Sequence, residues 1–337
     1  MRMTEKDKIG IVGLGLIGGS LAIALKGRYA VKGLAHKAED GEYALSTGMV
    51  GELARGLGDF SDCAAVVICT PLSLVRETAE RLVSLYPDKI ISDVGSVKGM
   101  LTGIKGRLIG GHPMAGTERK GVRAAKERLL ENACYILTDY NGDAEALAFM
   151  KKLVADAGAI PVVMGAEEHD RLVGRVSHLV HMAAYCLVDA AIEGDEEIVG
   201  SGFTDTTRVA SSPPDFWNTV AALNRGNIVD GMDDYIARLT ELRGKIAAGE
   251  DITAYLAAAK DKRDRVTGRR KSAGGYILYV DVPDCVGSVA GALAALAEGN
   301  ISIENLSVVH SREGAGGALR LEFKDEKDCD AAREILQ

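Results

Sequence analysis

A glycine-rich turn near the start of the chain constrains the fold more than any other feature. Residues 8–12 form a short apolar run, and Gly13, Gly15 and Gly18 follow in the spacing GxGxxG before a helical stretch. The first glycine permits a tight turn, the second lets the backbone approach a pyrophosphate, and the third lets helix and strand pack closely. Because the spacing lies between a strand and a helix, it predicts a dinucleotide site rather than a turn without a ligand. The residues expected to line this site are Gly13, Gly15, Leu16, Ile17 and Gly18.

Short apolar runs alternate with helical stretches over residues 1–165. Helical patterns such as 73–85 separate most of the runs. The runs are rich in Val and Ile and bounded by turn residues, as buried strands are. They are 8–12, 64–69, 89–92 and 134–137. This alternation predicts a parallel, doubly wound α/β sheet of the Rossmann type.

Two further regions differ in pattern from the first. Residues 166–271 contain long helix-forming stretches, at 167–191 and 227–248, so we predict an all-helical domain there. Its broad apolar stripes indicate a dimer interface. A basic stretch at 260–271, followed by Ser-Ala-Gly-Gly, indicates a helix end and a linker. Residues 272–337 then read as strand, helix, strand, strand, helix, which predicts a small α+β module.

Composition bounds the class of protein. A chain of 337 residues is too long for one ordinary core. The formal net charge is −8 and no long run of Lys or Arg occurs, which argues against nucleic acid and requires local cations for an anionic substrate. No apolar stretch approaches the roughly 20 residues of a membrane helix, and the N-terminus lacks a signal-peptide core. None of the six cysteines forms a CxxC pair, so we expect a cytoplasmic protein without a metal site.

The end of the second predicted strand bears on which dinucleotide binds. NAD-preferring folds place an acidic residue there, against the ribose 2′-hydroxyl. This chain has a small residue followed by His36 and Lys37, which suit a 2′-phosphate and favour NADP slightly over NAD. The alternative is that both are solvated surface residues and that Glu39 or Asp40 reaches the ribose.

Polar residues follow several predicted strands at their carboxyl ends, where doubly wound folds bind ligands. Thr70 and Pro71 are expected to line the cofactor, and Ser96 is expected beside both the cofactor and the reacting group. His112 is expected in a loop, between glycines and Pro113. Oxidation of a carbinol needs a base for the hydroxyl proton, and the near-neutral pKa of histidine suits that role. We therefore predict that His112 and Ser96 are catalytic, the alternative being an ordinary loop histidine.

The chain resembles the prephenate/arogenate dehydrogenase family. The resemblance covers nearly all of residues 8–265 and keeps the family's order of motifs. The motifs are DVGSVK (93–98), GGHPMAGTE (110–118), EHD (168–170), SHLVH (177–181), GFTDTTR (202–208), PDFW (214–217) and NR (224–225). Two departures stand out. Val180 replaces a common proline, and Thr204 replaces a basic residue, which removes one cation from the substrate pocket.

The resemblance implies oxidative decarboxylation of prephenate to 4-hydroxyphenylpyruvate, or of arogenate to tyrosine, with NAD or NADP. It implies that His112 accepts the proton of the ring hydroxyl with the help of Ser96. Arg208 matches the arginine that binds a carboxylate, which we expect to be the side-chain carboxylate. The alternative for Arg208 is an inter-helix salt bridge, and His181 is expected to donate to the substrate. Further substrate-pocket candidates are Thr117, Glu118, Ser177, Asp205 and Trp217.

The C-terminal module resembles ACT domains. Residues 282–289, VPDCVGSV, resemble their first strand-to-helix turn, and residues 300–305, NISIEN, resemble the start of their next strand. The helix N-terminus after Gly287 exposes amide donors that suit an amino-acid carboxylate. We expect a homodimer with feedback by an amino acid, most simply the end product tyrosine. The alternative is a module that only aids dimerisation.

Two other functions remain open. A hydroxyacid dehydrogenase also combines a Rossmann half with a helical half, but such enzymes typically carry a catalytic lysine on a helix, and none stands out. A non-catalytic amino-acid sensor that retains NAD(P) binding would not need Ser96, His112 and Arg208 together. His178 and His181 have an i, i+3 spacing that suits a metal. No carboxylate-rich partner set accompanies them, so His178 is expected to be a packing or pocket residue.

Overall fold

The computed structural model describes residues 8–116, 119–192, 194, 198–269, 276–283, 285–310 and 316–336. Its internal contacts divide the chain into two compact units, Met1–Arg238 and Leu239–Gln337. Among the described residues, no helix combines the length and the apolar character needed to cross a bilayer.

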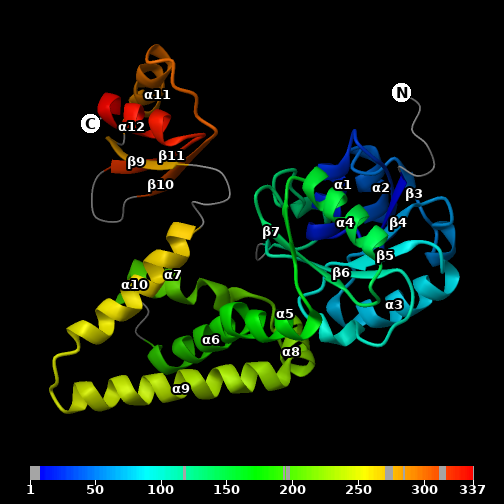
Figure 1. Cartoon of the computed structure of the whole chain (residues 1–337), viewed down its shortest axis with the longest axis horizontal. Coiled ribbons are helices and arrows are strands. Elements are labelled where there is room, and N and C mark those ends of the chain that lie inside the picture. The colour runs from blue at the N-terminus through cyan, green and yellow to red at the C-terminus, as the bar shows by residue number, and fades with distance from the viewer. Residues whose placement is uncertain are drawn as a thin grey trace. The chain divides into compact units, whose positions relative to one another are not determined.

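An eight-stranded sheet forms the first part of the N-terminal unit (Figure 1). In spatial order it contains β3 (Glu52–Leu53), β2 (Ala30–Leu34), β1 (Lys8–Val12), β4 (Ala65–Ile68), β5 (Ile90–Asp93), β6 (Leu108–Pro113), β7 (Cys134–Asp139) and β8 (Ile160–Val163). The strand order runs outward in both directions from the β1–β4 pair, as in a doubly wound fold. The prediction of a Rossmann-like sheet is therefore confirmed.

The expectation of a wholly parallel sheet is wrong at one pair. The β6 and β7 strands are antiparallel, whereas the other neighbouring pairs are parallel. A parallel connection requires a crossover of a dozen or more residues, usually a helix. In the described part of residues 114–133, the only helical element is the short turn Val122–Ala124. The chain therefore returns beside β6 in the opposite direction.

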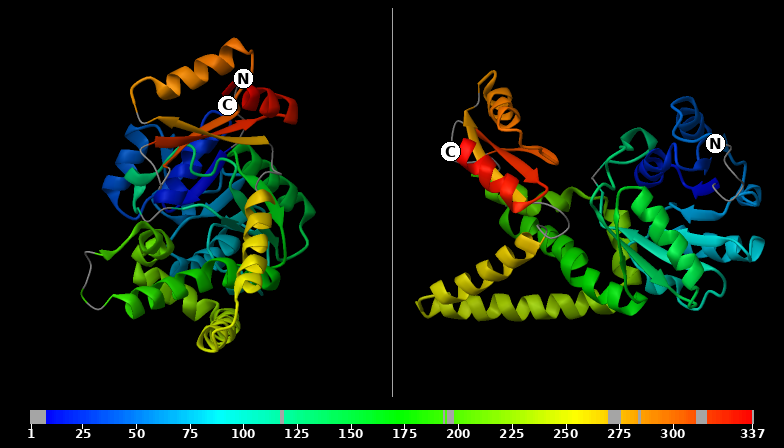
Figure 2. Two further views of the ribbon diagram at one scale, coloured as in Figure 1. Left: turned by 90° about the vertical axis from the view of Figure 1, so that its left-hand side faces the viewer. Right: turned by 45° about the horizontal axis from the view of Figure 1, so that its top comes forward.

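Helices cover both faces of the sheet, as the views in Figure 1 and Figure 2 show. On one face lie α1 (Leu16–Leu25), α2 (Ala38–Ser46) and α4 (Ala144–Asp156). The other face is covered by α3 (Leu72–Leu85). The α1 helix buries Leu21 and Leu25 against Ile9 and Ile11, and each fully buried side chain of this size contributes about 1.5–3 kcal/mol. The two apolar layers hold the carboxyl edge of the sheet in place.

An all-helical domain follows the sheet, as predicted. Its elements are α5 (Ala166–Val173), a π-type segment (Gly174–His178), α6 (Leu179–Ala191), α7 (Ser201–Thr207), a 3-10 turn (Arg208–Ser211), α8 (Pro214–Leu223) and α9 (Arg225–Ala247). The helix expected at 167–191 is continuous in the structure, with a wider π-type turn between α5 and α6. Trp217, Val220 and Ile228 pack against Leu72 and Val97 of the sheet domain. This apolar contact fixes the helical domain against the loops that leave the sheet.

The C-terminal unit contains α10 (Thr253–Arg269) and a small α+β module. The module contains β9 (Tyr276–Pro283), α11 (Ser288–Glu298), β10 (Asn305–His310), β11 (Gly316–Phe323) and α12 (Glu326–Leu336). Its three strands are antiparallel in the order β10-β11-β9, and α11 and α12 lie on the same face of the sheet (Figure 2). The predicted element order is confirmed, and the predicted linker at 272–275 lies outside the described residues.

Candidate functional site

The glycine turn after β1 leaves open space beside its backbone. Gly13 has a φ of +105°, and a Cβ there would lie 2.5 Å from the carbonyl oxygen of Cys69. A Cβ on Gly18 would lie 2.0 Å from the carbonyl oxygen of Gly13, so both positions require glycine. At Gly15 a Cβ would meet nothing within 4 Å. The N-terminus of α1, which begins with the buried Leu16 and half-buried Ile17, has no side-chain cap and no acidic residue in its first turn. The turn therefore fits a pyrophosphate.

Other predicted cofactor residues lie at the same edge of the sheet, because β1, β2 and β4 are parallel. The buried Thr70 hydroxyl has no hydrogen-bond partner among the described residues, as expected of a group that awaits a ligand. Pro71 is exposed at the start of α3. His36 and Lys37 are exposed after β2, and the ammonium of Lys37 lies 3.7 Å from the carboxylate of Glu39. These residues fit a bound dinucleotide.

His112 lies on a strand and not in a loop, which corrects the sequence-based expectation. It is the fifth residue of β6 and pairs with Ile136 across the antiparallel β6–β7 ladder. The side chain is buried, at 8% exposure. The two glycines before it hide a strand pattern, because glycine is unfavourable in strands. The imidazole is therefore carried by the rigid sheet.

A line of hydrogen bonds leads from His112 into the helical domain. Nδ1 of His112 lies 2.8 Å from Nε2 of His169, and Nδ1 of His169 lies 2.7 Å from Oδ1 of Asp170. His169 and Asp170 belong to α5 and are both buried. Sequence reasoning assigned them no role, and the available signal was the EHD motif itself. A contact across 57 positions leaves no trace in local periodicity.

Asp170 is held ionised by its neighbours. Burial raises its pKa, but hydrogen bonds from His169 and from the backbone N–H groups of Lys98 and Gly99 outweigh burial, and the pKa is lowered. The two backbone donors lie 2.7 Å from Oδ1 and Oδ2 respectively. The carboxylate therefore ties α5 to the loop after β5.

A second buried pair fixes the same loop. The Lys98 ammonium donates to both carboxylate oxygens of Asp93, at 2.7 and 2.6 Å, and to the carbonyl oxygen of Gly111. Asp93 also accepts from the backbone N–H groups of Gly95 and Gly111. Burial lowers the pKa of Lys98. This pair, which sequence reasoning also missed, joins β5 to the residue before His112.

The surroundings of His112 keep it neutral. Burial lowers its pKa well below the ordinary value, and the nearby His169, Lys98 and His178 lower it further. A neutral imidazole has one ring nitrogen with a free lone pair. The side chain is therefore in the protonation state that a general base requires at neutral pH.

His181 lies on α6 and stacks on Trp217, with ring centroids 3.6 Å apart and planes 26° apart. Its Nδ1 donates to the carbonyl oxygen of Ser177 at 2.9 Å, so Nε2 of the neutral ring is an acceptor and not the donor that the sequence led us to expect. Burial and the positive charge of Arg208 lower the pKa of His181. Arg208 is exposed and forms no ion pair within the described residues, so the alternative of an inter-helix salt bridge is absent there. Trp217 is buried and packs on both His178 and His181.

The remaining candidates are less closely joined to this cluster. Ser96 is half-buried in the loop after β5, and its side chain makes no hydrogen bond within the described part of the chain. Asp205 is exposed on α7. Thr117 and Glu118 lie outside the described residues.

His178 is fully buried in the π-type segment. The amide of Asn224 donates to its Nδ1 at 3.1 Å, so the proton of the neutral ring is on Nε2. That Nε2 has no partner among the described residues. Burial lowers the pKa of His178 to about 4. In the described part of the chain, no group of three or more His, Cys, Asp or Glu side chains is placed to hold a metal ion.

Comparisons with known proteins agree with this architecture. Residues 21–163 match the prephenate dehydrogenase nucleotide-binding domain, and residues 165–258 match the prephenate dehydrogenase dimerization domain. The chain is 34% identical to a prephenate dehydrogenase of Bacillus subtilis (strain 168), over 98% of this chain and 96% of that protein.

Solved structures give the same result. A crystal structure of Synechocystis arogenate dehydrogenase is 32% identical, with a TM-score of 0.67, over 77% of this chain and 99% of that chain. A crystal structure of A. aeolicus prephenate dehydrogenase in complex with hydroxyphenyl propionate and NAD+ is 31% identical, with a TM-score of 0.69, over 79% of this chain and 99% of that chain. The chain therefore belongs to the prephenate dehydrogenase family of oxidoreductases.

Proposed function

We propose that this protein oxidises prephenate to 4-hydroxyphenylpyruvate, with loss of CO2, using a nicotinamide dinucleotide. The observation that carries the proposal is the neutral His112, held on a sheet strand at the edge where the glycine turn opens. Carboxyl ends of parallel strands meet at one edge, so His112 on β6 and the glycine turn after β1 lie at the same edge of the sheet. This pairing suits hydride transfer from a carbinol.

The residues of the chain take four parts in this reaction. His112 accepts the proton of the ring hydroxyl, and the half-buried Ser96 orients that hydroxyl. The exposed guanidinium of Arg208 binds the side-chain carboxylate of the substrate. His181, whose Nδ1 proton is bonded to Ser177, presents Nε2 as an acceptor to the substrate beside Arg208. When bound, the cofactor supplies the hydride acceptor.

Three further predicted substrate residues have weaker structural support. Ser177 contributes its carbonyl oxygen to the orientation of His181. Trp217 supports the same ring by stacking, so its buried position favours a packing role over direct shielding of the substrate. Asp205, one turn before Arg208, stays a candidate for the substrate pocket.

The choice between NADP and NAD depends on the segment after β2. His36 and Lys37 are exposed there, and they offer an imidazole and an ammonium to a 2′-phosphate. In the alternative, the nearby carboxylate of Glu39 accepts a hydrogen bond from the ribose 2′-hydroxyl of NAD. We favour NADP slightly on the ground of these two side chains.

The choice between prephenate and arogenate depends on the charge near the side-chain end of the substrate. Arogenate carries an ammonium where prephenate carries a keto oxygen. Thr204, which replaces a basic residue common in the family, leaves Arg208 as the cation on this segment. Among the structural relatives, one is named an arogenate dehydrogenase and another a prephenate dehydrogenase. Arogenate therefore remains the second candidate substrate.

One set of assays tests the proposal. The purified enzyme is offered prephenate or arogenate with NAD or NADP, and the reduced cofactor is followed by absorbance. The His112→Asn variant should bind the cofactor normally and turn over about 10²–10⁴-fold more slowly. Failure of the wild-type enzyme to oxidise either substrate would refute the function, and near-normal turnover of the variant would refute the role of His112.

We further propose a division into residues 1–165, which bind the dinucleotide, 166–271, which bind substrate and dimerise, and 272–337, which regulate. The matched families divide between residues 163 and 165, next to the first of these boundaries. A homodimer accounts for the exposed apolar side chains Val176, Val180 and Ile236 of the helical domain. The cytoplasmic location stays a prediction.

The C-terminal module is proposed to be an ACT domain that binds tyrosine. Its element order and the free N-terminus of α11 after Gly287, which has no side-chain cap, support this proposal. Deletion of residues 272–337 should abolish inhibition by tyrosine while catalysis remains. An unchanged tyrosine response would leave the module with a role in dimerisation only.

A further inference from the structure

The hydrogen bonds from His112 through His169 to Asp170 all donate in the same direction, because the Asp170 carboxylate can only accept. An ionised carboxylate has no proton to donate, so Nδ1 of His169 carries the proton that bonds Oδ1 of Asp170. A His169 ring that carries only this proton has an acceptor at Nε2. The 2.8 Å contact requires a donor on the other side, so Nδ1 of His112 carries its proton. Nε2 of His112 is left with the lone pair.

We propose that His169 and Asp170 are positioning residues that hold His112 in the tautomer whose Nε2 accepts the substrate proton. This inference rests on the proposed role of His112 as the base. It deepens that role, because an imidazole in the other tautomer presents N–H to the substrate hydroxyl and cannot accept its proton. A rigid support exists on both sides, since His112 belongs to β6 and its two partners belong to α5.

The same line stabilises the charge that forms in the reaction. When Nε2 of His112 takes the proton, the ring becomes an imidazolium. Its Nδ1–H still donates to His169, and the charge is drawn toward the Asp170 carboxylate through the second imidazole. Buried charge needs such a partner, because burial alone disfavours the imidazolium.

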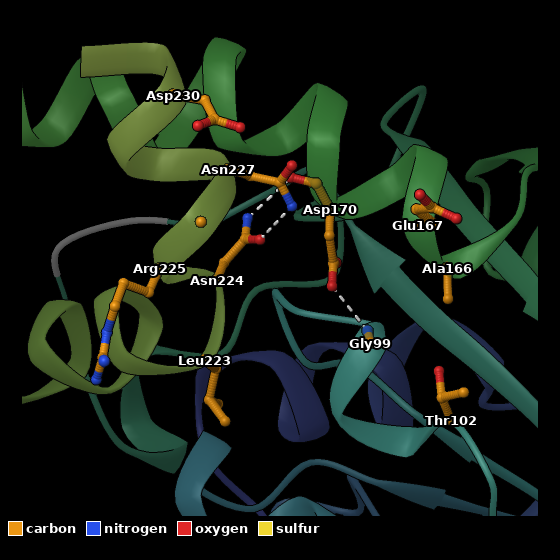
Figure 3. A pocket seen from close by; sticks show the side chains of 11 residues that line it. Gly99, Thr102, Ala166, Glu167, Asp170, Leu223, Asn224, Arg225, Asn227 and Asp230 are labelled. Atoms are coloured by element: carbon orange, nitrogen blue, oxygen red, sulfur yellow. Dashed lines mark hydrogen bonds between the residues drawn. The ribbon is translucent and has the colours of Figure 1, made fainter. Parts of the chain in front are cut away.

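Asp170 also lines a solvent-open cavity of about 390 Å³, which raises a second possibility, an exit path for the proton (Figure 3). Gly99, Asn224 and Asp230 also line this cavity. The hydrogen bonds on Asp170 decide against the exit path. Three N–H donors hold the carboxylate and lower its pKa, so it is a poor proton carrier. The carboxylate therefore stabilises the charge on the imidazoles and does not carry the proton away.

Nitrogen NMR of the wild-type enzyme tests the tautomer directly. The protein is labelled with ¹⁵N-histidine, and the signals of His112 are assigned by their loss in His112→Asn. At neutral pH we expect Nδ1 of His112 to carry the proton and Nε2 to be bare. A proton on Nε2 in the wild-type enzyme overturns the proposal without any variant.

The Asp170→Asn variant tests the consequence for catalysis. The substitution removes the negative charge that stabilises the imidazolium, whichever carboxylate oxygen the amide nitrogen replaces. An amide nitrogen in the place of Oδ1 also reverses both imidazoles and puts a proton on Nε2 of His112. We expect kcat to fall about 10²–10⁴-fold with little change in KM or cofactor affinity.

Asp230→Asn is the matched control, because it makes the same chemical change in the wall of the same cavity without touching the imidazole line. Its kcat should stay within about twofold of the wild type. A normal kcat in Asp170→Asn, with an inactive His112→Asn, would refute the positioning role while leaving the proposed function intact. An equal loss in both aspartate variants would instead assign the effect to the cavity.

Discussion

The ammonium of Lys98 lies 2.7 and 2.6 Å from the two carboxylate oxygens of Asp93, and both side chains are fully buried. Burying two charges carries a large desolvation cost, so this pair is weak support for stability in itself. It fixes geometry instead. Lys98 also reaches the carbonyl oxygen of Gly111, next to His112, and its backbone N–H bonds Asp170. One residue thereby links the loop after β5, the strand that carries His112, and α5.

Removal of one member of this pair should be costly. Lys98→Met leaves the Asp93 carboxylate buried without its cation, and we expect a loss of about 3–5 kcal/mol in the free energy of unfolding, measured by urea titration. Lys152→Met, which breaks the exposed pair with Asp156, is the control and should change stability very little. Equal effects of the two substitutions would contradict the structural role of Lys98.

Two substitutions in the glycine turn should have different effects, one on cofactor binding and the other on the stability of the fold. Gly15→Ala places a Cβ in open space, so the cofactor-free protein should keep its Tm while the dissociation constant of the dinucleotide rises about tenfold or more. Gly18→Ala drives a Cβ into the carbonyl of Gly13 and should destabilise the fold by about 1–3 kcal/mol. Calorimetry of unfolding and of binding measures both. If Gly15→Ala binds the cofactor as tightly as the wild type, the dinucleotide does not bind against the glycine turn.

The buried histidines predict how stability depends on pH. The pKa of His178 is about 4 in the folded chain, against about 6.5 in the unfolded chain, so the unfolded state binds more protons between these values. Its contribution to stability is complete above pH 6.5 and is lost as the pH falls toward 4. His112, also lowered, adds to the loss. The midpoints of urea unfolding at pH 7.5 and pH 5 measure this loss of stability. His178→Gln should flatten the dependence, and an unchanged slope would argue against this origin.

Cofactor choice should respond to charge after β2. If NADP is preferred, Lys37→Glu should lower the ratio of kcat/KM for NADP over NAD about tenfold, since one favourable charge is lost and one opposing charge is added. Lys26→Glu makes the same change of charge at the C-terminal end of α1, away from the glycine turn at its N-terminal end. This variant should leave the ratio of kcat/KM unaltered. No change with Lys37→Glu would favour contact between Glu39 or Asp40 and the ribose of NAD.

Local patterns predicted much of this molecule. The strand β1 was predicted to the residue, because the apolar run at 8–12 and the turn residues after it agree with the final fold. The glycine turn also has the geometry expected from its spacing. These features depend on neighbours in sequence, which periodicity reports.

The rest depended on contacts between distant residues. The strand β6 was missed because Gly110 and Gly111 weaken its pattern, although pairing on both sides stabilises it. His169 meets His112 across 57 positions, and Lys98 lies in a motif whose burial no local rule predicts. Sequence analysis therefore singled out His112 but not the groups that hold it.

The π-type turn Gly174–His178 has a consequence for how such a site changes over time. A π-type turn holds one residue more than an α-helical turn, so deletion of one residue there would restore α-helical geometry without rotating the helix beyond it. His169 precedes the turn and contacts His112, whereas His181 follows it and stacks on Trp217, and both side chains would stay on their present faces. The length of this segment is therefore free to change by one residue while the histidines on either side keep their contacts.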